Sequence, residues 1–98
     1  MLEKIIEHKL VKAAKERGGL AWKFTSPGTS GVPDRIILLR DGKVGFVEVK
    51  APGKKTRPIQ ERRIHELRRL GFYAVVIDGA EQIGGVLDEI GGEKNAPC

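Results

Sequence analysis

Apolar residues near the N-terminus recur every three or four positions, which is the spacing of one helix face. The pattern predicts a helix over residues 2–17, and Gly18 and Gly19 end it. The apolar stripe of this helix consists of Leu2, Ile5, Ile6, Leu10, Ala13 and Ala14.

Short apolar runs in the next third of the chain predict three strands, over residues 21–25, 34–40 and 44–50. The segment 26–33 between the first two is dense in Gly and Pro and is predicted to be a loop. Asp41-Gly42 lies between the second and third strands and is a strong hairpin signal. We therefore expect these two strands to fold back on one another.

The last third of the chain predicts a loop over residues 51–56, a helix that starts at Pro58 and runs to Leu70, and a buried strand over 73–77. That strand follows a helix, so we expect it to lie parallel to an earlier strand through a crossover. Residues 80–90 are typical of a short final helix, and the tail from Gly91 is expected to fray. The fold class is α/β, a small mixed sheet flanked by helices in the order αβββαβα.

Three charged residues are expected to converge at one end of this sheet. Side chains alternate along a strand, so Glu48 and Lys50 point to one face, with Cα atoms about 6.5–7 Å apart, and Val49 points to the other. The hairpin brings Asp34, at the start of its strand, close to the end of the strand that carries Glu48. Two carboxylates and an ammonium group set in this way suit metal-assisted phosphodiester cleavage.

The second long helix places two polar residues inside its core-facing stripe. Gln60 and Arg63 fall within the arc of about 140° that also holds Ile59, Ile64, Leu67 and Leu70, at 100° per residue. A polar residue facing inward needs a partner. Gln60 therefore either caps a loop or faces the same site as Glu48 and Lys50.

Composition narrows the class of protein. The chain has 98 residues, 40% hydrophobic and 32% charged, which supports one domain with a modest core. No apolar run approaches the roughly 20 residues that span a membrane, and the charged first helix is unlike a signal peptide, so we expect a cytoplasmic protein. Cys98 is the only cysteine, which excludes an internal disulfide and a cysteine-based zinc site.

Positive charge is concentrated beside the candidate site. The net charge is +5, and residues 50–69 alone carry eight basic and two acidic residues, a net charge of +6. This block favours a polyanionic substrate, although a solvated basic helix face explains it equally well. The glycine-rich loop 28–31 lacks the lysine-and-serine pattern of a P-loop, so no nucleotide cofactor is expected.

These residues together resemble the VRR-NUC family of the PD-(D/E)XK nuclease superfamily. The resemblance covers about residues 3–90, a single domain with the tail 91–98 outside it. It implies a restriction-endonuclease-like core, a divalent-metal-dependent endonuclease, and branched or duplex DNA as the substrate. The matching stretches are Gly31-Val32-Pro33-Asp34, Val47-Glu48-Val49-Lys50-Ala51-Pro52-Gly53, Gln60 and Leu70-Gly71-Phe72.

The resemblance also implies roles for single residues. Asp34, Glu48 and the backbone carbonyl of Val49 would bind Mg²⁺ or Mn²⁺. Lys50 would orient or help deprotonate the attacking water, and Gln60 would position Lys50 or that water. The family places a further glutamate on its first helix; Glu7 precedes Leu10-Val11 as that glutamate does, with Glu3 as the alternative.

DNA contacts are expected from Lys54, Lys55 and Arg57 in the loop beside the site, and from Arg63. A homodimer cutting four-way (Holliday) junctions is the preferred expectation, since short stand-alone members of the family look like phage or bacterial proteins that dimerise. A flap endonuclease or nickase, and a non-catalytic DNA-binding module, are the alternatives. Core packing is expected for Trp22 and Phe24, and solvent exposure for His65; Lys9, Lys12 and Lys15 have helix solvation as the simplest explanation.

Overall fold

The computed structural model describes residues 2–92, and within that range it confirms the predicted order of elements. Short 3₁₀ turns follow the second and fourth strands. The helices and strands are α1 (Leu2–Glu16), β1 (Leu20–Lys23), β2 (Arg35–Leu39), β3 (Lys43–Val49), α2 (Pro58–Arg69), β4 (Tyr73–Ile77) and α3 (Ile83–Ile90).

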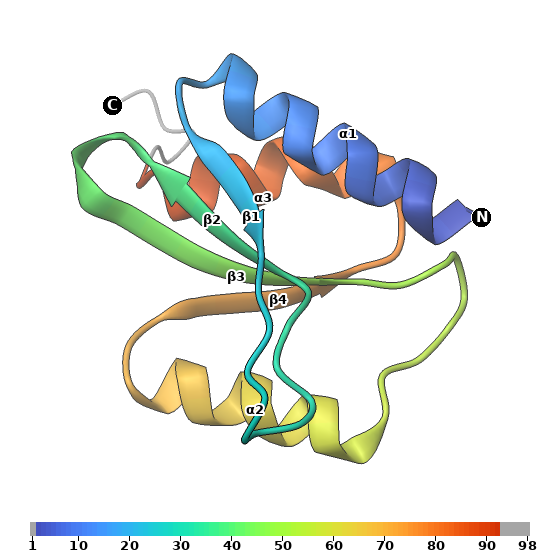
Figure 1. Cartoon of the computed structure of the whole chain (residues 1–98). Coiled ribbons are helices and arrows are strands. Elements are labelled where there is room, and N and C mark those ends of the chain that lie inside the picture. The colour runs from blue at the N-terminus through green and yellow to red at the C-terminus, as the bar shows by residue number, and fades with distance from the viewer. Residues whose placement is uncertain (1, 93–98) are drawn as a thin grey trace.

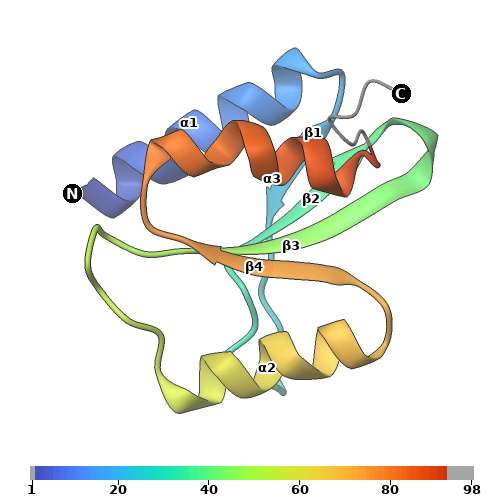
Figure 2. The same cartoon turned by 180° about the vertical axis from the view of Figure 1, so that it is seen from behind.

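The four strands form one mixed sheet in the order β1-β2-β3-β4. The first two pairings are antiparallel, and β3 pairs with β4 in parallel, as the crossover through α2 predicts. α1 and α3 cover one face of the sheet and α2 covers the other (Figures 1 and 2). The strand that carries Glu48 therefore lies inside the sheet, with a helix on each side.

The backbone conformation of the turn between β2 and β3 explains why these strands form a hairpin. Asp41 and Gly42 both adopt left-handed conformations, with φ of 64° and 72°. The Lys43 amide donates a hydrogen bond to the Arg40 carbonyl and closes the turn. Positive φ at both central positions matches the right-handed twist of the flanking strands, which is why the Asp-Gly pair predicted this hairpin.

The core has two parts, one on each face of the sheet. The larger part packs α1 and α3 on the sheet and includes Leu10, Val47, Val49 and Leu87, each 0% exposed. The smaller part lies under α2 and consists of Phe46, Ile64 and Ala74 with partly buried neighbours. Val47 and Val49 thus face α1 and α3, as expected, and Glu48 faces α2.

Two predictions of burial were wrong. Leu70 is 74% exposed because it is the C-cap of α2, beyond the last helical turn that packs on the sheet. Trp22 is 58% exposed; it alternates with the buried Ala21 and points to the face where α2 packs against β4, at the opposite edge of the sheet. Phe24 does pack inward, with its ring centroid 5.5 Å from that of Phe46.

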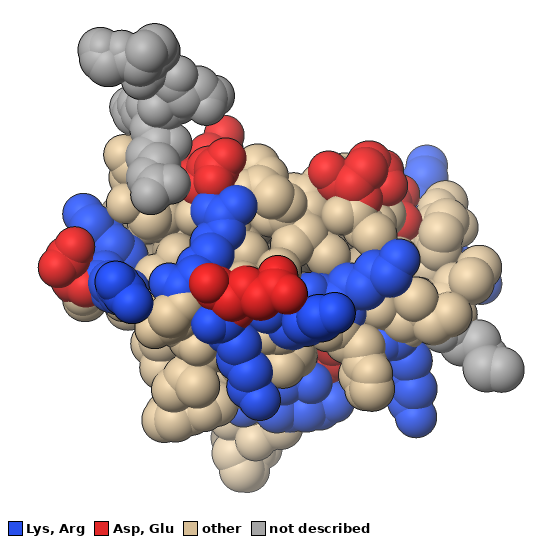
Figure 3. All heavy atoms as spheres, turned by 90° about the horizontal axis from the view of Figure 1, so that it is seen from above, with Lys and Arg blue, Asp and Glu red and all other residues tan. Residues whose placement is uncertain are grey.

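The N-terminal turns of α1 also depart from the predicted stripe. Leu2 and Ile5 are 57% and 51% exposed, because this end of the helix projects beyond the strands (Figure 1). Seen from above, over α1, basic side chains run across the surface with acidic side chains between them (Figure 3). No helix formed by residues 2–92 is long and apolar enough to cross a membrane. The predicted tail lies outside the described residues from position 93 onward.

Candidate active site

Glu48 is a buried carboxylate held between a lysine and an amide. It is 2% exposed, and its Oε2 lies 3.3 Å from Lys50 Nζ, which confirms that the two side chains share a face. Gln60 donates from Nε2 to the same oxygen at 2.9 Å. The Oε1 atom of Gln60 accepts the Arg57 amide at 2.9 Å, at the start of α2. Gln60 therefore does both things that the sequence left open: it caps the end of the loop at Arg57, and it lies beside Glu48.

The second carboxylate oxygen of Glu48 is unusual. Oε1 is buried and accepts no hydrogen bond from any residue in the range 2–92. Burial raises the pKa of Glu48 above its ordinary value, the negative charge of Asp34 raises it further, and Lys50 opposes both effects. Buried polar oxygens in proteins nearly always have a partner, so an orphan of this kind calls for an explanation.

Asp34 is fixed at the start of β2 by its surroundings. Its Oδ2 accepts the Val49 amide at 3.1 Å, and its backbone carbonyl accepts the Phe24 amide at 2.8 Å. The preceding loop approaches α2 closely at Gly31, where φ is +84° and a Cβ atom would lie 2.8 Å from Ile59 Cγ1. These contacts bring Asp34 to the end of β3, as the hairpin predicts.

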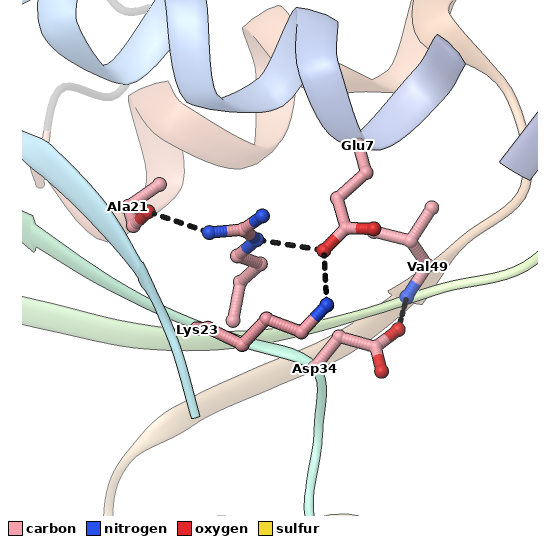
Figure 4. A network of polar contacts seen from close by, with 6 residues as sticks. Glu7, Ala21, Lys23, Asp34 and Val49 are labelled. Atoms are coloured by element: carbon pink, nitrogen blue, oxygen red, sulfur yellow. Dashed lines mark hydrogen bonds and ion pairs between the residues drawn. The ribbon is translucent and has the colours of Figure 1, made fainter. Parts of the chain in front are cut away.

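Glu7 reaches the same end of the sheet from the other face. It extends from α1 toward the point where Asp34 meets Val49 (Figure 4). Its Oε2 accepts Arg35 Nε at 2.8 Å and lies 3.6 Å from Lys23 Nζ. Glu3, the alternative, lies one turn earlier and forms no ion pair with the described residues. The position of Glu7 favours it as the acid of the first helix.

Arg35 is a site residue that the sequence interpretation missed. It donates from Nη1 to the Ala21 carbonyl at 3.1 Å as well as to Glu7, and its side chain is 17% exposed. The available signal was a single charge at the start of an otherwise apolar strand, directly after Asp34. Arg35 ties α1, β1 and β2 together beside the two carboxylates.

The donor set at this end of the sheet fits a hard divalent cation. Within residues 2–92, no group of three or more His, Cys, Asp and Glu residues is arranged to hold a metal ion. Asp34 and Glu48 nevertheless supply two carboxylates, and the buried Glu48 Oε1 is a free acceptor. Mg²⁺ is usually bound by one or two carboxylates and keeps several waters, so a small donor set of this kind suits it.

The candidate DNA-binding residues fall into two groups. Lys54, Lys55 and Arg57 are exposed on the loop between β3 and α2, beside Lys50. Arg63 is engaged within the protein, because Nε donates to the Ser30 carbonyl at 2.8 Å and Nη1 donates to Glu66. Arg63 therefore ties the loop 26–33 to α2, which leaves it fewer free donors than the loop residues have.

Comparison with known proteins gives the family. The model of the VRR-NUC domain matches residues 3–81. "Putative nuclease p44" from Acyrthosiphon pisum secondary endosymbiont phage 1 is 47% identical over 79 residues, which cover 81% of this chain and 85% of that protein.

Solved structures agree with the sequence comparison. One described as a VRR_NUC domain matches with a TM-score of 0.84 and 28% identity, over 90% of this chain and 96% of the other. Another, described as a VRR_NUC domain protein, matches with a TM-score of 0.74 and 19% identity, over 96% of this chain and 91% of the other, and supports the fold alone. The chain belongs to the VRR-NUC family of nuclease domains and has its restriction-endonuclease-like fold.

Proposed function

We propose that this nuclease is a divalent-metal-dependent endodeoxyribonuclease that hydrolyses phosphodiester bonds in branched DNA. Four-way junctions are the preferred substrate, and a homodimer is the active form. The observation that carries the proposal is Glu48 Oε1, a buried carboxylate oxygen without a partner among the described residues, beside a second carboxylate and a lysine. A protein that only bound DNA would gain nothing from acids clustered next to phosphate.

Asp34, Glu48 and the backbone carbonyl of Val49 are the groups that would hold Mg²⁺ or Mn²⁺. When bound, the ion would neutralise charge on a phosphate oxygen, lower the pKa of a water molecule and support the leaving 3′ oxygen. Glu7 is a further candidate ligand, and its Oε2 atom is already paired with Arg35 and Lys23.

The chain's own side chains supply orientation and charge. Lys50 is only 16% exposed and projects from the end of β3, where its ammonium group can orient the attacking water and stabilise negative charge on the phosphate. Gln60 fixes the Glu48 carboxylate through a 2.9 Å hydrogen bond and so limits its rotation. Pre-set groups of this kind need no rearrangement during the reaction, which lowers the barrier.

The proposals of a branched DNA substrate and of a homodimer are based on the charge of the loop after Lys50 and on the size of the chain. The exposed Lys54, Lys55 and Arg57 lie directly after Lys50, where they can contact the phosphates that flank the scissile bond. A chain of 98 residues offers little surface to hold a branched duplex. A two-fold dimer would match the pseudo-symmetry of a four-way junction and present two sites to opposite strands.

The test is a cleavage assay on three labelled substrates, a synthetic four-way junction, a matching linear duplex and a flap, each with Mn²⁺, Mg²⁺ or EDTA. We expect symmetric metal-dependent cuts in the junction that Lys50→Ala abolishes and that the exposed-site control His65→Ala retains. Cleavage of the flap or duplex in preference to the junction would agree with the proposed nuclease reaction but contradict the proposed preference for four-way junctions. DNA binding without cleavage in the presence of either metal ion would contradict the proposed nuclease activity and favour a DNA-binding module.

A further inference from the structure

A second basic surface lies on the opposite flank of the site from the loop 51–57. A groove of about 360 Å³ lies between α1 and the start of β2. We call it the α1 groove. Its lining residues are His8, Val11, Lys12, Lys15 and Arg35.

The two lysines of the α1 groove are not neutralised by the described part of the protein. None of its lining residues is acidic. Lys12 and Lys15 form no ion pair within the range 2–92, and both are exposed. Arg35 is paired with Glu7, but its Nη2 atom donates to no described residue. Two unpaired lysines, beside an arginine that is paired with Glu7 but keeps Nη2 free of described partners, form a site for a polyanion.

The α1 groove is continuous with the candidate active site through Arg35. This residue lines the groove and also donates to Glu7, which points toward Asp34 and Val49 (Figure 4). The groove residues then follow Glu7 along α1 toward its C-terminal end. The loop between β3 and α2 leaves the sheet on the other side, near the N-terminal end of α1 (Figures 1 and 2).

We propose that the α1 groove binds the phosphodiester backbone of the DNA on the side of the scissile bond away from the loop 51–57. This inference rests on the proposed function, and it gives the substrate a path: from Lys54 and Lys55, across Glu48 and Asp34, to Lys12 and Lys15. Phosphate is the ligand because the groove offers lysine and arginine donors, the groups that make most protein contacts to a DNA backbone. Lys12 and Lys15 thus have a role beyond helix solvation.

The test compares two double variants that remove the same charge. Lys12→Gln/Lys15→Gln changes the groove, whereas Lys9→Gln/Lys43→Gln changes one lysine of α1 outside the groove and one at the start of β3. Binding to the labelled junction is measured in EDTA by fluorescence anisotropy at several salt concentrations. Loss of two phosphate contacts makes the negative slope of log K for DNA binding against log salt concentration shallower by about 1.8. We expect that change, and an affinity loss on the order of tenfold at about 0.1 M salt, in the groove variant alone.

A second measurement locates the contact on the DNA. Single backbone phosphates are replaced by uncharged methylphosphonates at successive positions on each side of the branch point of the junction. The wild-type protein should lose affinity at a cluster of positions on one side, and Lys12→Gln/Lys15→Gln should be insensitive at those same positions. Equal slopes and equal affinities for the two double variants would overturn the groove as a DNA site. Since binding is measured without metal, this result is independent of whether the protein cleaves DNA.

Discussion

Gln60 joins the start of α2 to the Glu48 carboxylate, so replacing it should lower the free energy of unfolding. Gln60→Met keeps the length of the side chain but removes two hydrogen bonds, one to the buried Glu48 carboxylate and one from the Arg57 amide, both 2.9 Å. A hydrogen bond to a charged group contributes about 1.5–3 kcal/mol, and a lost helix cap costs about 1 kcal/mol. The free energy of unfolding should therefore fall by about 2.5–4 kcal/mol.

The chain provides a matched control for this experiment. Gln82 also caps a short helix through Oε1, which accepts two amides, those of Asp78 and Gly79, where Gln60 accepts one, and no hydrogen bond joins Gln82 to a buried carboxylate. Urea unfolding at pH 8 of Gln60→Met and Gln82→Met separates the cap from the site. We expect Gln60→Met to cost at least about 1.5 kcal/mol more, which is the share of the bond to Glu48. Equal losses would refute the idea that Gln60 stabilises the Glu48 carboxylate.

Three further predictions follow from the same structure. The pKa of Glu48 in the folded state is raised above 4.5, so this group stabilises the wild type at low pH, and the contribution is lost as the pH rises through the folded pKa. In urea unfolding, the stability of Glu48→Gln relative to wild type should therefore increase from about pH 4 to pH 8. Parallel curves of stability against pH for the two proteins would contradict the burial of this charge. Leu87→Ala should lower the free energy of unfolding by about 3 kcal/mol because Leu87 is 0% exposed, whereas Leu70→Ala, at a residue 74% exposed, should leave it nearly unchanged by the same measurement. In the cleavage assay, Glu7→Gln should reduce the rate by about a hundredfold or more and Glu3→Gln should not; a loss with Glu3→Gln alone would identify the other acid.

Much of the arrangement was predictable because local signals and the hydrophobic pattern agree. Asp41-Gly42 sets the hairpin, and the hairpin together with strand alternation brings Asp34, Glu48 and Lys50 to one place. Alternation also predicted that Val47 and Val49 anchor β3 on the other face. The order αβββαβα follows from the spacing of apolar residues, and the parallel pairing of β4 follows from the helical crossover through α2.

The features that the sequence did not predict depend on how far one helix or strand extends over another in the folded chain. Leu70 has the correct helical angle for burial but lies past the end of the contact between α2 and the sheet. Trp22 points to a face that α2 leaves open on that side. The pairing of Arg35 with Glu7 joins residues 28 positions apart, so it could not be seen before the packing of α1 on β2 was known.

The most direct test of the account is Mn²⁺ binding to the purified protein, followed by electron paramagnetic resonance. Wild type, Glu48→Gln and Glu81→Gln are compared at the same pH; Glu81 is exposed at the start of the turn before α3 and serves as the control for lost charge. If Glu48 Oε1 is a metal ligand, Glu48→Gln should weaken binding by at least about tenfold and Glu81→Gln should not change it. Equal Mn²⁺ affinity in all three proteins would contradict the claim that Glu48 holds the metal.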